Sequence, residues 1–476
     1  MKDLMAKLDR AFNPRSVAVV GDSTKLDYMW LNAMRTFQGE VYSVQVNPKD
    51  IPHIQKLGFD NYHSLLDIPG PVDYVVLSVP RKVVPQIISD CIQKGVAGVS
   101  LFTSGFAETH TEDGLEYQQR LTAMAEGAGL VLIGPNCMGI YNRRLGLRQN
   151  PEQPVGEGGE VGFISQSGTH AVLLSLAGAY HGIKLSKSVS YGNAIVLDSP
   201  DYLEYMAQDP ETRVIAMYIE GVKEGRRFFE VLRRAARAKP VVVWKGGRTE
   251  DGFRATSSHT AALAQSPQVW HALVKQCGAI QVDSFDSLLD TLKVLLHCKP
   301  TTGHNLALVA MSGGQSVAIA DAFTEAGFRA PPLTETSYRE LASFFDIIGG
   351  SYQNPFDIAW NVPSVEGVMK LIGIVDRDEN IDGIVLEIGV FFLERRWREK
   401  WADNIAGLID ALARFKAQSR KPLLVVVVPT NREEAALELM ARLGDKGIPG
   451  LPSFERGAVA LRRVVDYYRA RHALGQ

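Results

Sequence analysis

SVAVVG, at residues 16–21, is the first of five short apolar runs that are rich in β-branched residues. The others are VYSVQV (41–46), DYVVLSVP (73–80), GVSLF (98–102) and LVLIGPN (130–136). Helix-like stretches separate these runs, and the alternation is typical of a doubly wound parallel sheet. Ligands of such sheets bind beyond the carboxyl ends of the strands, so the turns that follow these runs are the first places to look for a site.

A stretch rich in Pro and Gly, QNPEQPVGEGGE (149–160), predicts a domain boundary after this block. A second series of apolar runs follows, comprising VGFIS (161–165), KLSKSVSYGN (184–193), VIAMYIEG (214–221) and PVVVWKGG (240–247). This series ends before residue 300, where we expect another boundary. The pattern again predicts strands of a parallel sheet.

A third series opens with NLALVAMSGG (305–314) and continues with DGIVLEIGV (382–390) and PLLVVVV (422–428). We therefore expect an α/β protein of three consecutive Rossmann-like or flavodoxin-like domains with parallel sheets, without an ATP-grasp domain. The expected domains are 1–148, 155–298 and 303–476.

The second and third domains resemble an internal repeat. In each, an apolar strand runs into a Ser/Gly turn, FISQSG or VAMSGG, and an apolar helix then ends at glycine. Gly168 to Gly182 and Gly313 to Gly327 span the same distance along the chain. The alternative is that any two strand-turn-helix units look alike.

Composition restricts the possible partners. The 51 basic and 53 acidic residues leave a net charge of -2, which gives no reason to expect nucleic acid or an anionic membrane as a partner. The N-terminus lacks the apolar stretch of a signal peptide, and the apolar runs are too short to cross a bilayer. The four cysteines match neither a metal-ligand spacing nor a CxxC pair. We expect a cytoplasmic protein without a metal site of its own.

The first turn departs from a dinucleotide fingerprint. It reads GDSTKLDYMW and keeps only the first glycine, Gly21. The second strand leads into Gln45, Val46, Asn47, Pro48 and Lys49, where a nicotinamide-binding domain usually has an acidic residue for the ribose. A phosphate-bearing ligand beside Lys49 is therefore favoured over NAD.

Two further segments suit phosphate chemistry. SQSG (165–168) lies between a strand and a helix, so backbone N–H groups at the helix start could hold an anion, although capping of the helix is the alternative. TSSHTAAL (256–263) places His259 at a turn or helix entrance. A histidine can carry a phosphoryl group when a carboxylate holds its other nitrogen, and Glu220 is our candidate for that carboxylate. A capping His and a surface Glu are the alternatives.

Several segments together resemble one family in order and spacing. They are NPRSVAVVG (13–21), VNPK (46–49), SVPRKVVPQ (78–86), FTSGFAE (102–108), GPNCMGIYN (134–142), FISQSG (163–168), YIEG (218–221) and SSHTAAL (257–263). That family is the NDP-forming acyl-CoA synthetases, which are related to the α subunit of succinyl-CoA synthetase. NPFD (354–357) and GIPGLPSFERGAVAL (447–461) also look like the third domain of the acetate–CoA ligases.

The resemblance implies that nucleoside triphosphate phosphorylates a histidine, which passes the phosphate to a carboxylic acid before the thiol of CoA attacks the acyl phosphate. His259 would be the carrier and Glu220 the carboxylate that steadies it. The other implied residues divide into three groups by ligand. They are Ser165, Gln166, Ser167 and Gly168 for phosphate; Gly21, Ser23, Lys49, Val79, Pro80, Thr103, Ser104, Asn136 and Cys137 for CoA; and Glu108 and Asn193 for the substrate.

The resemblance also implies a partner. ATP or GTP and Mg²⁺ would bind to a separate ATP-grasp β subunit in an α2β2 assembly, because residues 300–476 continue as a third Rossmann-like domain. Two departures from the family stand out: the first turn lacks its usual glycines, and Ala261 and Gln265 replace glycines after the histidine. A non-catalytic regulator that binds CoA or acyl-CoA is therefore the alternative function.

Overall fold

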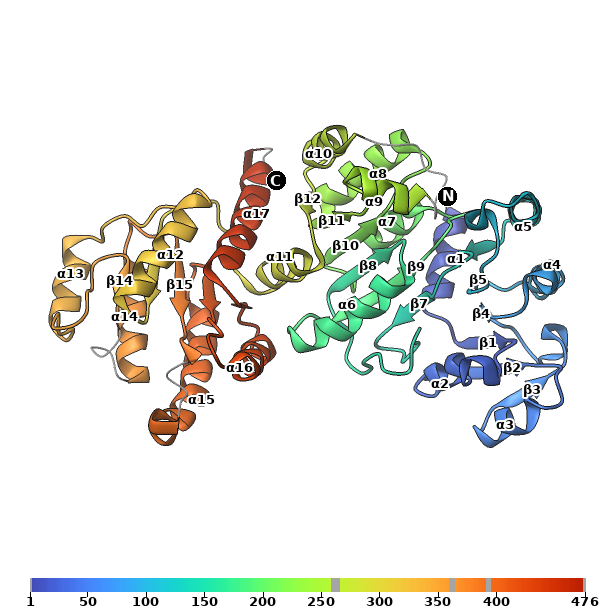
Figure 1. Cartoon of the computed structure of the whole chain (residues 1–476), viewed down its shortest axis with the longest axis horizontal. Coiled ribbons are helices and arrows are strands. Elements are labelled where there is room, and N and C mark those ends of the chain that lie inside the picture. Colours follow the sequence, from blue (N-terminus) through green and yellow to red (C-terminus); the bar gives the residue numbers. More distant parts are fainter. Residues whose placement is uncertain (1, 258–265, 359–363, 391–394, 474–476) are drawn as a thin grey trace. The chain divides into compact units, whose positions relative to one another are not determined.

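The computed structural model describes residues 2–257, 266–358, 364–390 and 395–473. Three sheets follow one another along the chain, each with helices packed against it (Figure 1). The predicted α/β class with parallel sheets is thereby confirmed, and the described residues form no ATP-grasp domain. The central strands are buried along their whole length, as is usual for parallel strands covered on both faces.

The first sheet has the strand order β3-β2-β1-β4-β5-β6, and all its pairings are parallel. This order is that of a dinucleotide-binding fold. Its strands are β1 (Ser16–Val20), β2 (Glu40–Val44), β3 (Asp60–Tyr62), β4 (Tyr74–Leu77), β5 (Gly98–Leu101) and β6 (Val131–Ile133). Its helices are α1 (Lys2–Phe12), α2 (Met29–Met34), α3 (Ile51–Lys56), α4 (Val84–Lys94) and α5 (Glu112–Ala128), with short 3-10 turns η1 (Thr24–Leu26), η2 (Leu65–Asp67), η3 (Arg81–Val83) and η4 (Ala107–Thr109).

The second sheet has the order β12-β11-β10-β8-β9-β7. Five strands are parallel in the flavodoxin-like order, and β7 pairs antiparallel with β9 at the edge. The strands are β7 (Gly139–Asn142), β8 (Val161–Ser165), β9 (Leu185–Ser190), β10 (Val214–Ile219), β11 (Val241–Lys245) and β12 (Ile280–Val282). The helices are α6 (Gly168–Tyr180), α7 (Ser199–Gln208), α8 (Gly225–Ala238), α9 (Glu250–Ser257) and α10 (Pro267–Gln276).

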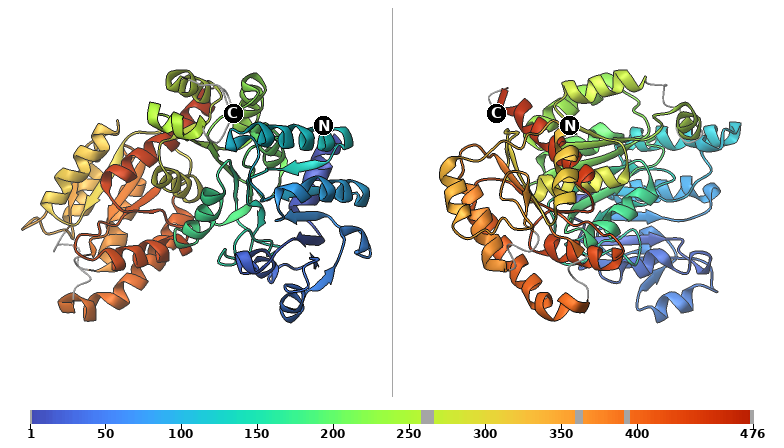
Figure 2. Two further views of the ribbon diagram at one scale, coloured as in Figure 1. Left: turned by 45° about the vertical axis from the view of Figure 1, so that its right-hand side comes forward. Right: turned by 60° about the vertical axis from the view of Figure 1, so that its left-hand side comes forward.

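The third sheet, β14-β13-β15-β16-β17, repeats the flavodoxin-like order, which supports the internal repeat expected from the sequence. Its strands are β13 (Leu306–Ala310), β14 (Phe356–Asp357), β15 (Gly383–Glu387), β16 (Leu423–Val426) and β17 (Gly450–Leu451). Its helices are α11 (Phe285–His297), α12 (Gly313–Glu325), α13 (Glu335–Ala342), α14 (Val365–Arg377), α15 (Arg395–Gln418), α16 (Glu433–Asp445) and α17 (Phe454–Ala473). Helices α12 and α17 pack side by side, and α14 and α15 form another pair (Figure 2).

The chain divides into two compact units. Residues 1–179 and 184–283 form the first unit, which contains the first two sheets, and residues 180–183 and 284–476 form the second. Strand β7 lies within the expected first domain but joins the second sheet, and α11 lies within the expected second domain but belongs to the second unit. The bounds 1–148, 155–298 and 303–476 remain a proposal.

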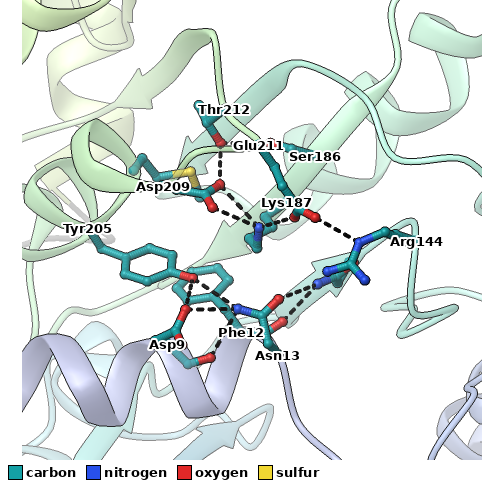
Figure 3. A network of polar contacts seen from close by, with 12 residues as sticks. Asp9, Phe12, Asn13, Arg144, Ser186, Lys187, Tyr205, Asp209, Glu211 and Thr212 are labelled. Carbon is teal, nitrogen blue, oxygen red and sulfur yellow. Dashed lines mark hydrogen bonds and ion pairs between the residues drawn. The ribbon is translucent and has the colours of Figure 1, made fainter.

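Polar and aromatic contacts join the helices of the first two sheets inside the first unit (Figure 3). The ring of Phe12 in α1 stacks on Tyr205 in α7 at 4.6 Å, and the Tyr205 hydroxyl donates to Asp9 at 3.1 Å. Beside them the buried ammonium of Lys187 in β9 donates to both carboxylate oxygens of Asp209, at 3.0 and 3.1 Å. The contacts of α1 with α7 therefore hold the first two sheets together, whereas the Lys187–Asp209 pair lies within the second.

The described part of the chain offers neither a membrane span nor a metal cluster. None of its helices combines the length and the apolar character that crossing a bilayer requires. No three His, Cys, Asp or Glu side chains within it gather as a metal site would need. All four cysteines are buried and free.

Candidate functional site

The second sheet reverses its strand order between β8 and β10, since β9 lies on one side of β8 and β10 on the other. Ligands of open α/β sheets bind at such a point, beyond the carboxyl ends of the strands. Ser165 ends β8, and Glu220 directly follows β10. The structure thus brings two sequence-predicted segments, 165–168 and Glu220, to the same edge of one sheet.

The turn from β8 into α6 is held by its own hydroxyl groups. The buried hydroxyl of Ser165 donates to the carbonyl oxygen of Ser167 at 2.6 Å. The hydroxyl of Ser167 accepts from the backbone N–H of His170 at 3.3 Å, which makes Ser167 a helix cap. Capping, the alternative considered for SQSG, is therefore present, and the positive end of the α6 dipole still faces this edge.

Gln166 has a role that its position in SQSG did not reveal. Its side-chain oxygen accepts from the backbone N–H of Glu220 at 2.8 Å and from that of Gly221 at 3.1 Å. The backbone N–H of Gln166 donates to the carbonyl oxygen of Tyr218 at 3.0 Å. Gln166 therefore clamps the loop that carries Glu220 onto the end of β8.

Lys245, which sequence reasoning missed, holds the same loop from the other side. It ends β11, and its ammonium donates to the carbonyl oxygen of Glu220 at 2.7 Å. Burial lowers the pKa of Lys245, and the negative charge of Glu220 partly opposes that shift. A lysine that ends an apolar strand was the only sequence signal for this contact.

His259, the predicted phosphate carrier, lies outside the described residues, between the end of α9 at Ser257 and the start of α10 at Pro267. Its role stays a prediction.

The turns expected to bind CoA form a row along the carboxyl edge of the first sheet. Gly21, at φ +85°, lies so close to Val79 that a Cβ atom on Gly21 would be 2.4 Å from Cγ1 of Val79. The hydroxyl of Thr103 donates to the carbonyl of Val79 at 2.6 Å, and the N–H of Asn136 donates to the carbonyl of Thr103 at 3.1 Å. These contacts link four of the turns that were predicted to bind CoA.

The remaining predicted CoA residues differ in exposure. Lys49, Pro80 and Ser104 are exposed and Ser23 is half-buried, so each can be reached by a ligand. Cys137 is buried, and burial raises the pKa of its thiol to about 12. Its thiol therefore stays protonated, which suits a structural position better than contact with a reacting group.

The first turn is filled by a carboxyl group that the sequence analysis did not single out. Asp22 is buried and accepts from the backbone N–H of Leu31 at 2.8 Å and of Ser23 at 3.1 Å. Burial raises the pKa of Asp22 to about 6. Where related folds use glycines to admit a diphosphate, this turn carries its own acid at the start of α2.

Glu108 and Asn193, the two predicted substrate residues, are in contact. The Asn193 amide donates to Glu108 at 2.6 Å, and Glu108 also accepts from the N–H groups of Gly105 at 2.6 Å and Phe106 at 3.1 Å. The N–H of Asn193 donates to the carbonyl of Pro135 at 3.0 Å. The pair therefore joins turns of the first sheet to the loop after β9, and its contact with substrate stays a prediction.

The loop that follows β6 reaches the start of α6. The N–H of Met138 donates to the hydroxyl of Ser190 at 3.1 Å. The side chain of Met138 lies against Gly168, since a Cβ atom there would be 2.8 Å from Cγ of Met138. Asn136, at the predicted thiol end of the CoA site, thus lies two residues from Met138, which is in direct contact with the predicted phosphate-binding turn at residues 165–168.

Two family models match the part of the chain that contains the first two sheets. Residues 15–143 match the family described as CoA binding domain, and residues 158–295 match the succinyl-CoA ligase like flavodoxin domain. The α subunit of acetate–CoA ligase [ADP-forming] II from Pyrococcus furiosus is 33% identical over 453 residues, which cover 94% of this chain and 94% of that subunit. The chain belongs to the family of ADP-forming acetate–CoA ligases.

Other members of the ADP-forming acetate–CoA ligase family extend the comparison. Acetate–CoA ligase [ADP-forming] I from Archaeoglobus fulgidus is 38% identical over 384 residues, and the match covers 80% of this chain but only 54% of that protein. The solved structure of the dinucleotide forming acetyl-coenzyme A synthetase 1 from Ca. Korarchaeum cryptofilum, in complex with phosphate and ADP, is 29% identical. It covers 98% of both chains with a TM-score of 0.83.

Proposed function

We propose that the chain is the α-type subunit of an NDP-forming acyl-CoA ligase, which joins a small carboxylic acid to CoA at the expense of a nucleoside triphosphate. Membership of the ADP-forming acetate–CoA ligase family supports this function. The observation that carries it is the arrangement at the end of β8, where Gln166 clamps the loop of Glu220 and Gly168 lies against Met138 of the CoA domain.

The reaction proceeds in three group transfers. A ring nitrogen of His259 attacks the γ-phosphorus of the nucleotide, and the nucleoside diphosphate leaves. A carboxylate oxygen of the acid then takes the phosphoryl group from His259, which forms an acyl phosphate. The sulfur of CoA attacks the acyl carbon, loses its proton and expels inorganic phosphate.

The described residues supply positioned groups for these transfers. In this proposal the carboxylate of Glu220 is the acceptor for the second ring nitrogen of His259 and keeps the imidazole oriented. N–H groups at the start of α6, which begins at Gly168, stabilise the phosphoryl oxygens. Phosphoryl transfer depends chiefly on such positioning and on electrostatic stabilisation.

The nucleotide and Mg²⁺ belong to a separate ATP-grasp β subunit in this proposal, and the assembly is α2β2. The relative from Pyrococcus furiosus is named as a subunit alpha, which supports a partner of this kind. We also assign the protein to the cytoplasm, where four free and buried cysteines are expected to remain reduced.

Labelling of His259 tests the proposal. The chain is mixed with a candidate ATP-grasp subunit, acetyl-CoA and radiolabelled phosphate, and acid-labile protein phosphate is measured. We expect label in the wild type and none in His259→Asn. Label that persists in His259→Asn, or the absence of label in the wild type with active partner subunits, would refute the assignment.

A non-catalytic regulator that binds CoA or acyl-CoA is the second candidate. The acid at Asp22, in the turn where a diphosphate would be expected, favours it. Calorimetry with CoA and a turnover assay with the partner separate the two functions. Binding of CoA without turnover or phosphorylation would identify the regulator.

A further inference from the structure

Tyr218 lies two residues before Glu220, at the end of β10, and its hydroxyl donates to Oε1 of Glu220 at 3.3 Å. The side chain is almost fully buried, with 8% of the residue exposed. Burial and the neighbouring charge of Glu220 raise the pKa of the Tyr218 phenol well above its usual range. The hydroxyl therefore keeps its proton near neutral pH and donates to Glu220.

Two aromatic rings from other elements hold the ring of Tyr218. His170, in the first turn of α6, packs at 4.4 Å between ring centroids with an interplanar angle of 63°. Trp244, the register partner of Tyr218 on β11, packs at 4.6 Å with an angle of 65°. These edge-to-face contacts are the favoured geometry for aromatic pairs, so the hydroxyl is aimed by a rigid support.

Gly246 leaves the space in which the Tyr218 hydroxyl meets Glu220. A Cβ atom on Gly246 would lie 2.6 Å from the hydroxyl oxygen of Tyr218 and 3.4 Å from Cγ of Glu220. Any larger residue would push the two side chains apart. The contact therefore requires a glycine at position 246. The backbone of Gly246 is also held in place, because its N–H donates to the carbonyl of Ile219 at 2.9 Å.

Lys245 and His170 are titratable groups beside this contact. Lys245 approaches the carbonyl oxygen of Glu220 from β11, and burial lowers the pKa of His170, so that ring remains neutral at pH 7. The backbone of Glu220 is held by Gln166 and Lys245, which leaves the orientation of the carboxylate to be set by its side-chain partners.

We propose that Tyr218 is a positioning residue for the phosphohistidine carrier: its hydroxyl orients the Glu220 carboxylate that steadies His259. This inference rests on the proposed function. Tyr218 does not touch the phosphoryl group in this proposal. It acts through Glu220, and the packing of His170 and Trp244 against its ring fixes the position of its hydroxyl.

Tyr218→Phe tests the inference because it removes the hydroxyl and keeps the ring against His170 and Trp244. The rate of His259 phosphorylation is measured with acetyl-CoA, radiolabelled phosphate and the ATP-grasp subunit, from pH 5 to 9. We expect a rate about tenfold lower, with the KM for acetyl-CoA unchanged, because a hydrogen bond to a charged group is lost. The acidic limb of the pH profile should move to higher pH, since the hydroxyl stabilises the charged form of the carboxylate.

Tyr42→Phe is the matched control. Tyr42 also donates to a glutamate two residues away, Glu40, at 2.6 Å, but that pair lies on β2 at the amino-terminal end of the first sheet. We expect wild-type rate and pH profile in this variant. Gly246→Ala should reproduce the Tyr218→Phe effect, because its methyl group would displace the Tyr218 hydroxyl from Glu220.

The outcomes separate the two proposals. If His259→Asn is unlabelled but Tyr218→Phe matches the wild type in rate and pH profile, the role of Tyr218 is wrong and the ligase function stands. The role is also wrong if the lower rate appears equally in Tyr42→Phe, or without any shift of the acidic limb. If label persists in His259→Asn, the ligase function itself fails.

Discussion

Gly168 and Met138 are in direct contact, so the first residue of α6 touches the loop that follows the last strand of the first sheet. The contact leaves no room for a side chain, because a Cβ atom on Gly168 would lie 2.8 Å from Cγ of Met138. The start of α6, where phosphate is predicted to bind, and the predicted thiol end of the CoA site therefore cannot shift independently of each other.

Gly168→Ala should lower the rate of His259 phosphorylation about tenfold, because the new methyl group pushes the Met138 loop away from the helix start. The double variant Gly168→Ala, Met138→Ala should recover most of that rate, since it makes room for the methyl group. The labelling assay with acetyl-CoA measures both. A double variant that is no better than Gly168→Ala would contradict the contact as the cause.

Gln166→Leu should lower His259 phosphorylation by about ten- to a hundredfold while CoA affinity is unchanged. The substitution keeps the volume of the side chain but leaves the N–H groups of Glu220 and Gly221 without their acceptor, which costs about 1–3 kcal/mol for a buried donor. Calorimetry with CoA and the labelling assay provide the two readouts. Loss of CoA affinity alone would show that Gln166 acts elsewhere.

Lys187→Met should destabilise the first unit by about 3–5 kcal/mol, because it leaves the carboxylate of Asp209 buried without its cation. The extra variant Asp209→Asn should restore part of the loss. Lys184→Met is the matched control, since the pair of Lys184 with Glu157 is exposed and contributes about 0–1 kcal/mol. Urea unfolding measures all of these variants, and equal losses for the two lysines would contradict the expectation.

Asp22→Asn should change how stability depends on pH. The pKa of Asp22 is raised to about 6, so its contribution is fully present below about pH 4 and is lost as pH rises through 6. The wild type should therefore lose up to about 3 kcal/mol relative to Asp22→Asn between pH 4 and 7. Melting temperatures of both proteins across that range test this, and parallel curves would show that Asp22 does not titrate there.

Gly182→Ala should destabilise the second unit more than Gly349→Ala. Both glycines have positive φ, +68° and +78°, so each alanine is strained by about 1 kcal/mol. Only Gly182 meets a neighbour, because its Cβ atom would lie 2.7 Å from the Cα of Gly444, whereas nothing lies within 4 Å at Gly349. Thermal unfolding should show a loss in Gly182→Ala at least twice that in Gly349→Ala.

Much of the fold could be predicted because its strands are buried parallel strands, which form continuous apolar runs such as SVAVVG. The antiparallel strand β7 could not be predicted from such a pattern. Its residues, GIYN, follow the first sheet in sequence but pair with β9, more than forty residues later. Pairing over such a distance leaves no local pattern to read.

The site was predictable where it depends on strand ends. Ser165 and Glu220 could be brought together from sequence because the carboxyl ends of neighbouring parallel strands share an edge. The direction of side chains could not be read in the same way. Gln166 was predicted only as part of the phosphate-binding turn, and the contact of its side chain with the backbone of Glu220 has no signal in the sequence; Asp22 fills a turn that the sequence shows only as lacking glycines.

The segment 180–183 has a consequence for dissecting the chain. It begins at the last residue of α6 and leads to β9 of the first unit, but it belongs to the second unit, where Gly182 packs on Gly444 and its carbonyl oxygen accepts a hydrogen bond from His297 at 3.2 Å. If residues 1–283 were expressed alone, these four residues would lack α16, against which Gly182 packs. A gene split at residue 283 would thus yield a first fragment in which this segment lacks its packing partners, and recombination there should be poorly tolerated unless both halves are made together.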